Sequence, residues 1–172
     1  MYITYYAILS ALPLYLVNDL QASEMQVGFV VGVYTIASVL VRPFSGFALD
    51  RFGRRLVFLI ALLVYSFLFV GYLVALSISA LLMLRFAQGL TWGFTTVAGS
   101  TVAADIVPVS KRGQGIGYFA LSTTVGMSVG PLIGLFICQQ WNFVAMFIVA
   151  CIFSLASLAC ASAIHMRKRF VV

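Results

Sequence analysis

Carboxylates and guanidinium groups that lie close together in the sequence are the first candidates for function. Residues 46–55 read GFALDRFGRR, and the small and charged positions in this run are Gly46, Asp50, Arg51, Gly53, Arg54 and Arg55. A carboxylate at a helix end can pair with an arginine or with the positive N-terminus of another helix. The first glycine permits close approach of a neighbouring helix, and the second permits a tight turn. The run therefore predicts a charged turn that forms ion pairs or anchors to a membrane surface.

Two further arginines, Arg42 and Arg85, lie within long apolar runs rather than between them. A guanidinium group is costly to place in lipid, so such residues usually face the interior of a helical bundle or an aqueous cavity. Arg85 is followed by Gln88 and Gly89, which add a polar amide and a position that allows close approach. We therefore expect these four residues to mark a bundle interior.

A third pattern, GMSVGPLIG at residues 126–134, combines regularly spaced glycines with a proline: Gly126, Gly130, Pro131 and Gly134. Glycines at this spacing form a flat helix face, and proline bends a helix. The run also satisfies the Gly-Xaa-Ser-Xaa-Gly pattern of serine hydrolases. Ser128 would lie in mid-helix, however, and the sole histidine, His165, is at the end of another apolar run. We therefore expect a packing face and no enzyme.

The composition indicates that membrane-spanning helices must position these residues. Of 172 residues, 63% are hydrophobic and only 8% are charged, whereas a soluble domain carries roughly a quarter charged residues. So few charges could not cover a soluble surface, so lipid must cover most of it. The net charge of +6 does not indicate nucleic acid as a partner, because the basic residues form short clusters between apolar runs. The three cysteines fit no zinc or haem spacing, and neither a metal nor a cofactor is expected.

Six apolar runs are candidates for helices that cross the bilayer, which takes about 20 residues. We predict spans at residues 2–17, 26–49, 56–76, 80–107, 114–138 and 143–164. Their connections are short, so neighbouring helices should be antiparallel. The first span is short for a full crossing, so we expect either that the true start lies upstream or that the chain is a fragment.

Lysine and arginine residues are confined to alternate connections, which predicts the orientation. The connections after the second and fourth spans and the C-terminal tail contain eight of them: Arg51, Arg54, Arg55, Lys111, Arg112, Arg167, Lys168 and Arg169. The opposite connections contain none. We expect a multi-pass protein of the plasma (inner) membrane with both termini in the cytoplasm. Residues 1–166 would form the transmembrane bundle, and residues 167–172 a basic cytoplasmic tail.

An internal repeat is visible at an offset of 88 residues. Three identities carry it, namely Gln26 with Gln114, Pro43 with Pro131 and Gly46 with Gly134. A unit of three helices has an odd number of spans, so its second copy must be inverted in the membrane. The expected fold class is an all-α membrane protein of six transmembrane helices in two inverted three-helix repeats.

The three patterns resemble the signature motifs of the major facilitator superfamily of transporters. Residues 46–55 resemble motif A, the loop between the second and third spans. The run Arg85-Phe-Ala-Gln88-Gly89, with Gly93 four residues further on, resembles motif B, and residues 126–134 resemble motif C, the antiporter motif. The departure is Leu135, where the family often has a second glycine. The resemblance covers essentially the whole chain, which is similar to the N-terminal six-helix half of such a transporter.

The resemblance implies a role for each motif. Motif A is expected to be a conformational latch that closes the cytoplasmic side. An acid at the place of Asp105 often pairs with the motif A arginine, so we predict an Asp105–Arg54 contact with a network that reaches Asp50. The motif B arginine, Arg85, is implicated in proton coupling, since its permanent charge biases the pKa of nearby carboxylates. Members with motif C are mostly exporters, especially drug–proton antiporters.

The function implied for the complete protein is efflux of a small organic solute or drug, coupled to proton entry, by alternating access. The candidates to line the substrate cavity are Tyr5, Tyr6, Ser10, Gln88 and Trp92, for which helix packing or contact with lipid is the alternative. No acid lies in mid-span. The coupling carboxylate would then lie in a second half, or the protein would be a facilitator or an uptake transporter.

The expected partners are a small-molecule substrate, protons, the lipid bilayer and a second six-helix half or a homodimeric copy. In the family the substrate path lies between two halves, and a cavity-facing surface containing Arg85 would be costly to cover with lipid. The alternative is a truncated or inactive half-transporter.

Overall fold

The computed structural model describes residues 1–75 and 77–163. His165, the predicted tail at residues 167–172 and the last residue of the third and of the sixth predicted span lie outside the described residues. The described part is helical: α1 (Tyr2–Asn18), α2 (Glu24–Leu40), α3 (Arg42–Phe52), α4 (Arg54–Val74), α5 (Ile78–Ile106), the 3₁₀ helix η1 (Val109–Lys111), α6 (Arg112–Gln140) and α7 (Phe143–Ser162).

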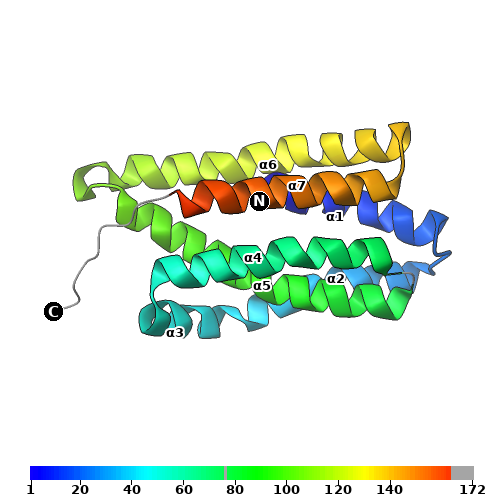
Figure 1. The fold of residues 1–172 in the computed structure, drawn as a ribbon, viewed down its shortest axis with the longest axis horizontal. Helices are drawn as coiled ribbons and strands as arrows, with labels where there is room; N and C mark the ends of the chain where they lie inside the picture. Colours follow the sequence, from blue (N-terminus) through cyan, green and yellow to red (C-terminus); the bar gives the residue numbers. More distant parts are fainter. Residues whose placement is uncertain (76, 164–172) are drawn as a thin grey trace.

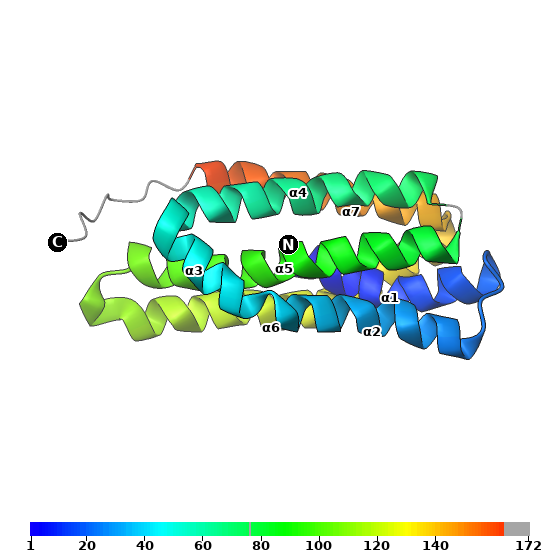
Figure 2. The same cartoon turned by 90° about the horizontal axis from the view of Figure 1, so that it is seen from below.

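The long helices run along one common axis, and consecutive long helices are antiparallel (Figure 1). α1 and α5 form a middle layer, with α4 and α7 on one side and α2 and α6 on the other (Figure 2). The turn between α3 and α4, the connection around η1 and the end of α7 all lie at one end of the bundle (Figure 1). The turn and the connection contain basic residues, and the end of α7 precedes the basic tail of the sequence. All three segments are therefore at the same end.

Short polar side chains define the starts of three helices. Ser23 and Gln26 form a reciprocal capping box at the start of α2. The Ser77 hydroxyl accepts a hydrogen bond from the Ala80 amide at the start of α5, and Asn142 begins α7 in the same way. Each of these caps satisfies amide groups that have no partner within the helix.

The predicted second span is not a single helix. α2 and α3 meet at Val41 and are bent by 46° relative to each other. Pro43 is the second residue of α3. In a continuous helix it would lack the amide hydrogen for a bond to the carbonyl of Val39, and its ring would clash with that carbonyl. The prediction of one continuous span over residues 26–49 is corrected to two helices. Its repeat counterpart α6 continues through Pro131 without a break.

Fewer helices meet the length and hydropathy of a membrane span than the six predicted. Three of the described segments do so, Arg54–Val74, Val109–Gln140 and Phe143–Ser162, and the bent pair of α2 and α3 adds a fourth if it is one span. α1 has only 17 residues, and α5 carries Arg85 and Gln88 in its first half. The six-span count stays a prediction.

Polar and apolar residues are distributed as in a protein surrounded by lipid. Large apolar side chains cover the outside; Phe44 is 68% exposed and Leu132 is 70% exposed. Several polar side chains are buried inside, namely Thr4, Ser38, Ser45, Ser66, Arg85, Gln88, Thr95 and Ser154. A water-soluble protein shows the opposite arrangement. The described helices therefore form a bundle of a multi-pass membrane protein.

The helix bounds support the internal repeat predicted from the sequence. α2 begins at Glu24 and α6 begins at Arg112, 88 positions later. The Ser66 and Ser154 hydroxyls, also 88 positions apart, are hydrogen-bonded to each other at 2.7 Å between α4 and α7. Equivalent residues of two copies touch only near the axis that relates the copies. α4 and α7 run in opposite directions (Figure 1), as an inverted repeat requires.

Candidate functional site

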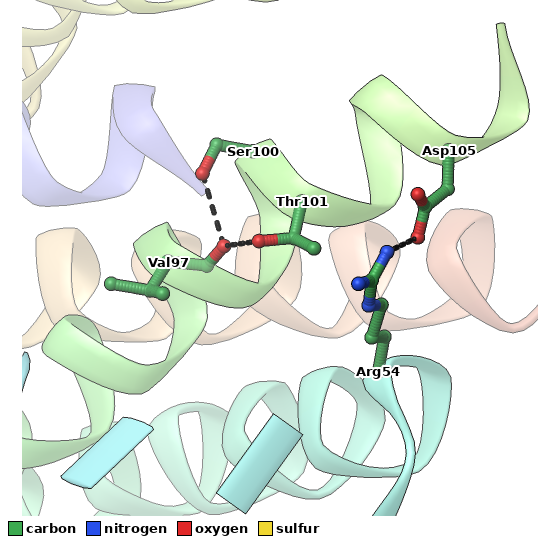
Figure 3. A network of polar contacts seen from close by, with 5 residues as sticks. All are labelled: Arg54, Val97, Ser100, Thr101 and Asp105. Atoms are coloured by element: carbon green, nitrogen blue, oxygen red, sulfur yellow. Dashed lines mark hydrogen bonds and ion pairs between the residues drawn. The ribbon is translucent and has the colours of Figure 1, made fainter. Parts of the chain in front are cut away.

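The turn between α3 and α4 brings two consecutive arginines to the ends of two other helices. Gly53 allows this turn because its φ of 91° is in the left-handed region. Arg54 Nη1 donates to Asp105 Oδ2 near the end of α5 (Figure 3). Arg55 Nη2 donates to the carbonyl oxygen of Ser162 at 2.8 Å, at the end of α7. The predicted Asp105–Arg54 contact is therefore present, and a second arginine interacts favourably with a helix C-terminus.

The ion pair stands apart from the hydroxyl groups one turn before it on α5. Ser100 and Thr101 both donate to the carbonyl oxygen of Val97, at 3.0 Å and 2.8 Å (Figure 3). Because both hydroxyls donate within the helix, they do not donate to Asp105, and Arg54 supplies the hydrogen bond to its carboxylate. The side chains of Arg54 and Asp105 are 43% and 21% exposed, and pairs this accessible contribute only about 0–1 kcal/mol.

The predicted extension of this network to Asp50 is not found. Asp50 is exposed and forms no ion pair with any of the described residues. Ser45 and Leu49 form the buried face of α3, and Asp50 lies about 100° around the helix from Leu49. Arg51 instead lies against the rings of Phe47 and Phe52, with its Cζ 5.8 Å and 5.7 Å from their centroids.

Gly46 also departs from its expected role. A side chain built at Gly46 would have no atom within 4 Å, so no helix in the described part of the chain approaches it. Its position at the start of the charged turn is therefore not explained by packing within this bundle.

Arg85 lies in the middle layer of the bundle and is only 2% exposed. Its Nη1 donates to Gln88 Oε1 at 3.4 Å, and the Tyr72 hydroxyl donates to the same oxygen at 2.8 Å. The guanidinium carbon is 5.4 Å from the ring centroid of Tyr34 and 5.7 Å from that of Tyr72. We call Tyr34, Tyr72, Arg85 and Gln88 the Arg85 cluster.

The rings around Arg85 compensate only part of the cost of burying its charge. A desolvated cation–π contact contributes about 2 kcal/mol, whereas removing a guanidinium group from water costs several kcal/mol. Arg85 forms no ion pair with a described carboxylate. The Arg85 cluster therefore holds a charge whose stabilisation is incomplete.

The motif B glycines allow α5 to pack closely on α2. A Cβ atom at Gly89 would lie 2.3 Å from the carbonyl oxygen of Tyr34, and one at Gly93 would lie 2.7 Å from that of Ser38. Gly89 thus brings Tyr34 over the guanidinium group of Arg85.

The antiporter-motif glycines allow the equivalent approach between α6 and α1. A Cβ atom at Gly130 would lie 2.7 Å from Tyr6 Cβ, and one at Gly134 would lie 2.5 Å from the carbonyl oxygen of Ala7. Gly126 is equally close to Tyr2. The predicted flat face is present, and the backbone of α1 covers it. Pro131 lies within the uninterrupted helix α6.

The predicted cavity residues occupy different environments. Tyr5 stacks on Trp92, with ring centroids 4.5 Å apart, and is next to Tyr6 at 4.8 Å. Both tyrosines are partly exposed, whereas Trp92 is 8% exposed. Ser10 donates to the carbonyl oxygen of Ala7 within α1. The structure thus places Tyr5 and Trp92 together and Ser10 apart.

An apolar hollow on the described surface lies elsewhere. It has a volume of about 470 Å³ and is open and almost entirely apolar. It lies between α2, at Gly28 and Gly32, and the start of α5, at Ile78 and Leu82. None of the predicted cavity residues lines it.

The assignment of Arg42 to the bundle interior is wrong. Arg42 is the first residue of α3 and is exposed, as are Pro43 and Phe44 after it. After the bend at Val41, the face of α3 that is buried contains Ser45 and Leu49. Arg42 is not among the buried residues of α3, so its guanidinium group lies outside this bundle.

The sequence motifs do not include the tyrosines of the Arg85 cluster or their neighbour Tyr65. Tyr65, Phe69 and Tyr72 are buried and follow a spacing of four and three residues along α4, which places them on one helix face. This spacing was the available signal. No sequence pattern indicates Tyr34, because it reaches Arg85 only through the close packing of α2 on α5 at Gly89.

Comparisons with known proteins agree with this architecture. The family model of the Major Facilitator Superfamily matches residues 1–170. Among curated proteins, Multidrug resistance protein 1 of Bacillus subtilis is 27% identical over 83% of this chain and 37% of its own length. The MFS antiporter QDR3 of Candida albicans is 30% identical over 81% of this chain and 21% of its own length. Quinolone resistance protein NorA of Staphylococcus aureus is 26% identical over 77% of this chain and 34% of its own length.

The fold is shared with a solved transporter. The inward open conformation of the xylose transporter XylE from E. coli matches with a TM-score of 0.82 at 19% identity, over 96% of this chain and 45% of that one. The chain thus spans less than half the length of each of these proteins. Because the family model matches nearly all of its residues, the chain belongs to the major facilitator superfamily of membrane transporters.

Proposed function

We propose that this chain is the N-terminal six-helix half of a transporter that expels a small organic solute by alternating access, coupled to proton entry. One observation carries the efflux direction. Two curated relatives that align with most of this chain are named for multidrug or quinolone resistance, and a third is named an antiporter. Gly126, Gly130 and Gly134 add support, because they form the packing face expected of an antiporter motif.

The contacts of the charged turn support a role as a conformational latch. Arg54 and Arg55 join the start of α4 to the ends of α5 and α7. Both contacts are exposed, so water can replace them at little cost when the helix ends separate. We infer that they favour the state in which this end of the bundle is closed, and that further contacts with a second half complete the latch.

The topology belongs to the same proposal. The end of the bundle that contains the charged turn would face the cytoplasm, because basic residues favour that side. α1, the bent pair of α2 and α3, α4, α5, α6 and α7 would be the six spans in residues 1–166, in the plasma membrane. Residues 167–172 would begin a cytoplasmic connection.

The need for a second half is supported by Arg42 rather than by Arg85. Arg85 is already enclosed within this bundle, whereas Arg42 is an exposed charge at the start of α3, followed by the exposed side chains of Phe44 and Phe47. A protein partner or a path to the headgroups would be required to stabilise its charge. Gly46, on the same helix, is also open to a neighbour.

An uptake transporter or facilitator is the second candidate. It is favoured by the positions of Asp19, Glu24, Asp50 and Asp105, all of which lie near helix ends and leave no obvious proton carrier in mid-span. In the efflux proposal the second half supplies that carboxylate, while Arg85 biases its pKa.

Dye transport into everted membrane vesicles tests the proposal. The vesicles are prepared from cells that express the protein and are energised to make their interior acidic, and ethidium uptake is followed by fluorescence. We expect uptake that stops when a protonophore is added. Uptake that is unaffected by the protonophore would indicate a facilitator, and absence of uptake for a panel of dyes and sugars would indicate an inactive half.

A further inference from the structure

The Arg85 cluster contains more hydrogen-bond donors than acceptors. Arg85 Nε, Arg85 Nη2, Gln88 Nε2 and the Tyr34 hydroxyl are all buried and have no hydrogen-bond partner among the described residues. Gln88 Oε1 is the only carbonyl oxygen among these side chains, and it is already shared by Arg85 and Tyr72. Buried donors of this kind are normally satisfied, so the cluster requires an added acceptor.

No described carboxylate is placed to supply that acceptor. Asp105 is on the same helix as Arg85 but twenty residues away, which is about 30 Å along the axis. Glu24 is ten residues from Tyr34 along α2, which is about 15 Å. Asp19 and Asp50 are near other helix ends. The guanidinium charge therefore has no carboxylate partner within the described helices.

Aromatic rings surround these donors and extend to the accessible side of α1. Tyr34 lies over the guanidinium group and is stacked on Tyr5 at 5.3 Å. Tyr5, which is partly exposed, is also stacked on Trp92. A flat aromatic group that enters beside Tyr5 would therefore be one ring away from the unpaired donors.

From these contacts we propose that the Arg85 cluster is a binding site for a singly charged anion, and that the carboxylate of an aromatic solute is its ligand. A carboxylate has only acceptors, matches the fork of guanidinium donors, and neutralises the buried charge. A free halide could use the same donors. The inference rests on the proposed transport function, since it places aromatic carboxylates among the transported solutes.

The test uses the fluorescence of Trp92. The sequence contains two tryptophans, and Trp141→Phe leaves Trp92 as the sole reporter. The purified protein is titrated with benzoate, with the uncharged analogue benzamide and with chloride, all at constant ionic strength. We expect a saturable change with benzoate and a dissociation constant at least tenfold higher for benzamide. Chloride that competes with benzoate would support a free halide as an additional ligand of the same site.

Matched variants establish where the anion binds. Arg85→Gln should raise the benzoate dissociation constant at least tenfold, whereas Arg42→Gln, which removes a charge from the exposed arginine, should leave it unchanged. Because Arg85→Gln could impair folding, Tyr34→Phe provides a milder variant that removes one donor and retains the ring. It should raise the constant about threefold to tenfold.

The site is disproved if benzoate causes no saturable change, if benzamide binds as tightly as benzoate, or if neither Arg85→Gln nor Tyr34→Phe weakens binding. These outcomes are separate from the failure of the proposed function. Dye efflux without anion binding would disprove only the anion-site proposal. Anion binding without transport of any solute would disprove only the transport proposal.

Discussion

Arg54 and Arg85 carry the same chemical group in opposite settings. Arg54 is exposed and paired with Asp105, so its contact costs little to form or to break. Arg85 is buried between two rings and lacks a carboxylate partner in the described helices, so its charge strongly disfavours any state that leaves it unsatisfied. The first residue suits a contact that switches, and the second suits a binding site.

The Arg54–Asp105 pair should have a small but measurable coupling. We expect Arg54→Gln and Asp105→Asn each to lower the free energy of unfolding by at most about 1 kcal/mol, and the double variant to cost less than their sum. The measurement is a double-mutant cycle of denaturation in detergent at low and high salt. The coupling should decrease at high salt, because both side chains are accessible to screening ions.

Arg51→Gln is the matched control for this cycle. Arg51 is in the same charged turn but contacts phenylalanine rings instead of a carboxylate. Strictly additive effects of Arg54→Gln and Asp105→Asn, or an equal coupling between Arg51 and Asp105, would show that the pair is not a specific interaction.

Among the elements, the spacing between helices depends on glycines of α5 and α6. Gly89 and Gly93 admit the backbone of α2, and Gly126, Gly130 and Gly134 admit that of α1. α1 and α5 form the middle layer (Figure 2), so both glycine faces set how the outer layer packs on the middle one. Close packing of this kind is one of the forces that drive helix association in lipid.

Gly130→Ala should separate α1 from α6. The added methyl group would lie 2.7 Å from Tyr6 Cβ and 2.9 Å from the carbonyl oxygen of Ile3, and neither atom is the end of a flexible side chain. We expect a loss of about 1–3 kcal/mol, measured as a decrease in the melting temperature of the purified protein.

Gly117→Ala provides the control on the same helix. A Cβ atom at Gly117 has no neighbour within 4 Å, so this variant should be neutral or slightly stabilising, since alanine is the better helix former. Equal melting temperatures for the two variants would mean that α1 does not pack against the motif C face.

For the molecule as a whole, the exposed Arg42 leads us to expect assembly with another unit. The chain aligns with 37% of the Bacillus subtilis relative and 45% of XylE. We expect the mass of the complex purified in mild detergent to exceed that of one chain, because a second half or a second copy would cover this surface. A monomer that carries out dye efflux in liposomes would contradict this expectation.

Arg42→Leu tests whether this arginine is at the interface. We expect it to change the fraction of assembled complex in native mass spectrometry, because the exposed charge would no longer select a polar partner. Arg51→Leu is the control, since it is on the same helix but is held by its own phenylalanine neighbours. The same assembled fraction for both variants would place Arg42 outside the interface.

The sequence by itself determined that the chain is helical and at which end of the bundle the charged turn and the connection around η1 lie, but not the break between α2 and α3. Long apolar runs can only be helices in lipid, because every backbone amide must find its partner within the run. The alternation of basic connections and the offset of 88 then predicted their order, and the motif around Asp50 predicted the Asp105–Arg54 contact that the structure contains.

Only the tertiary structure decided which face of each helix is inside. Nearly every position in these helices is apolar, so periodicity could not distinguish the interior from the lipid-facing side. Arg42 and Asp50 were therefore misplaced, and Tyr34 and Tyr72 went unnoticed although they enclose Arg85. The glycine contacts that bring α2 against α5 are made between residues distant in sequence, and those contacts leave Arg85 buried without a carboxylate partner in the described helices.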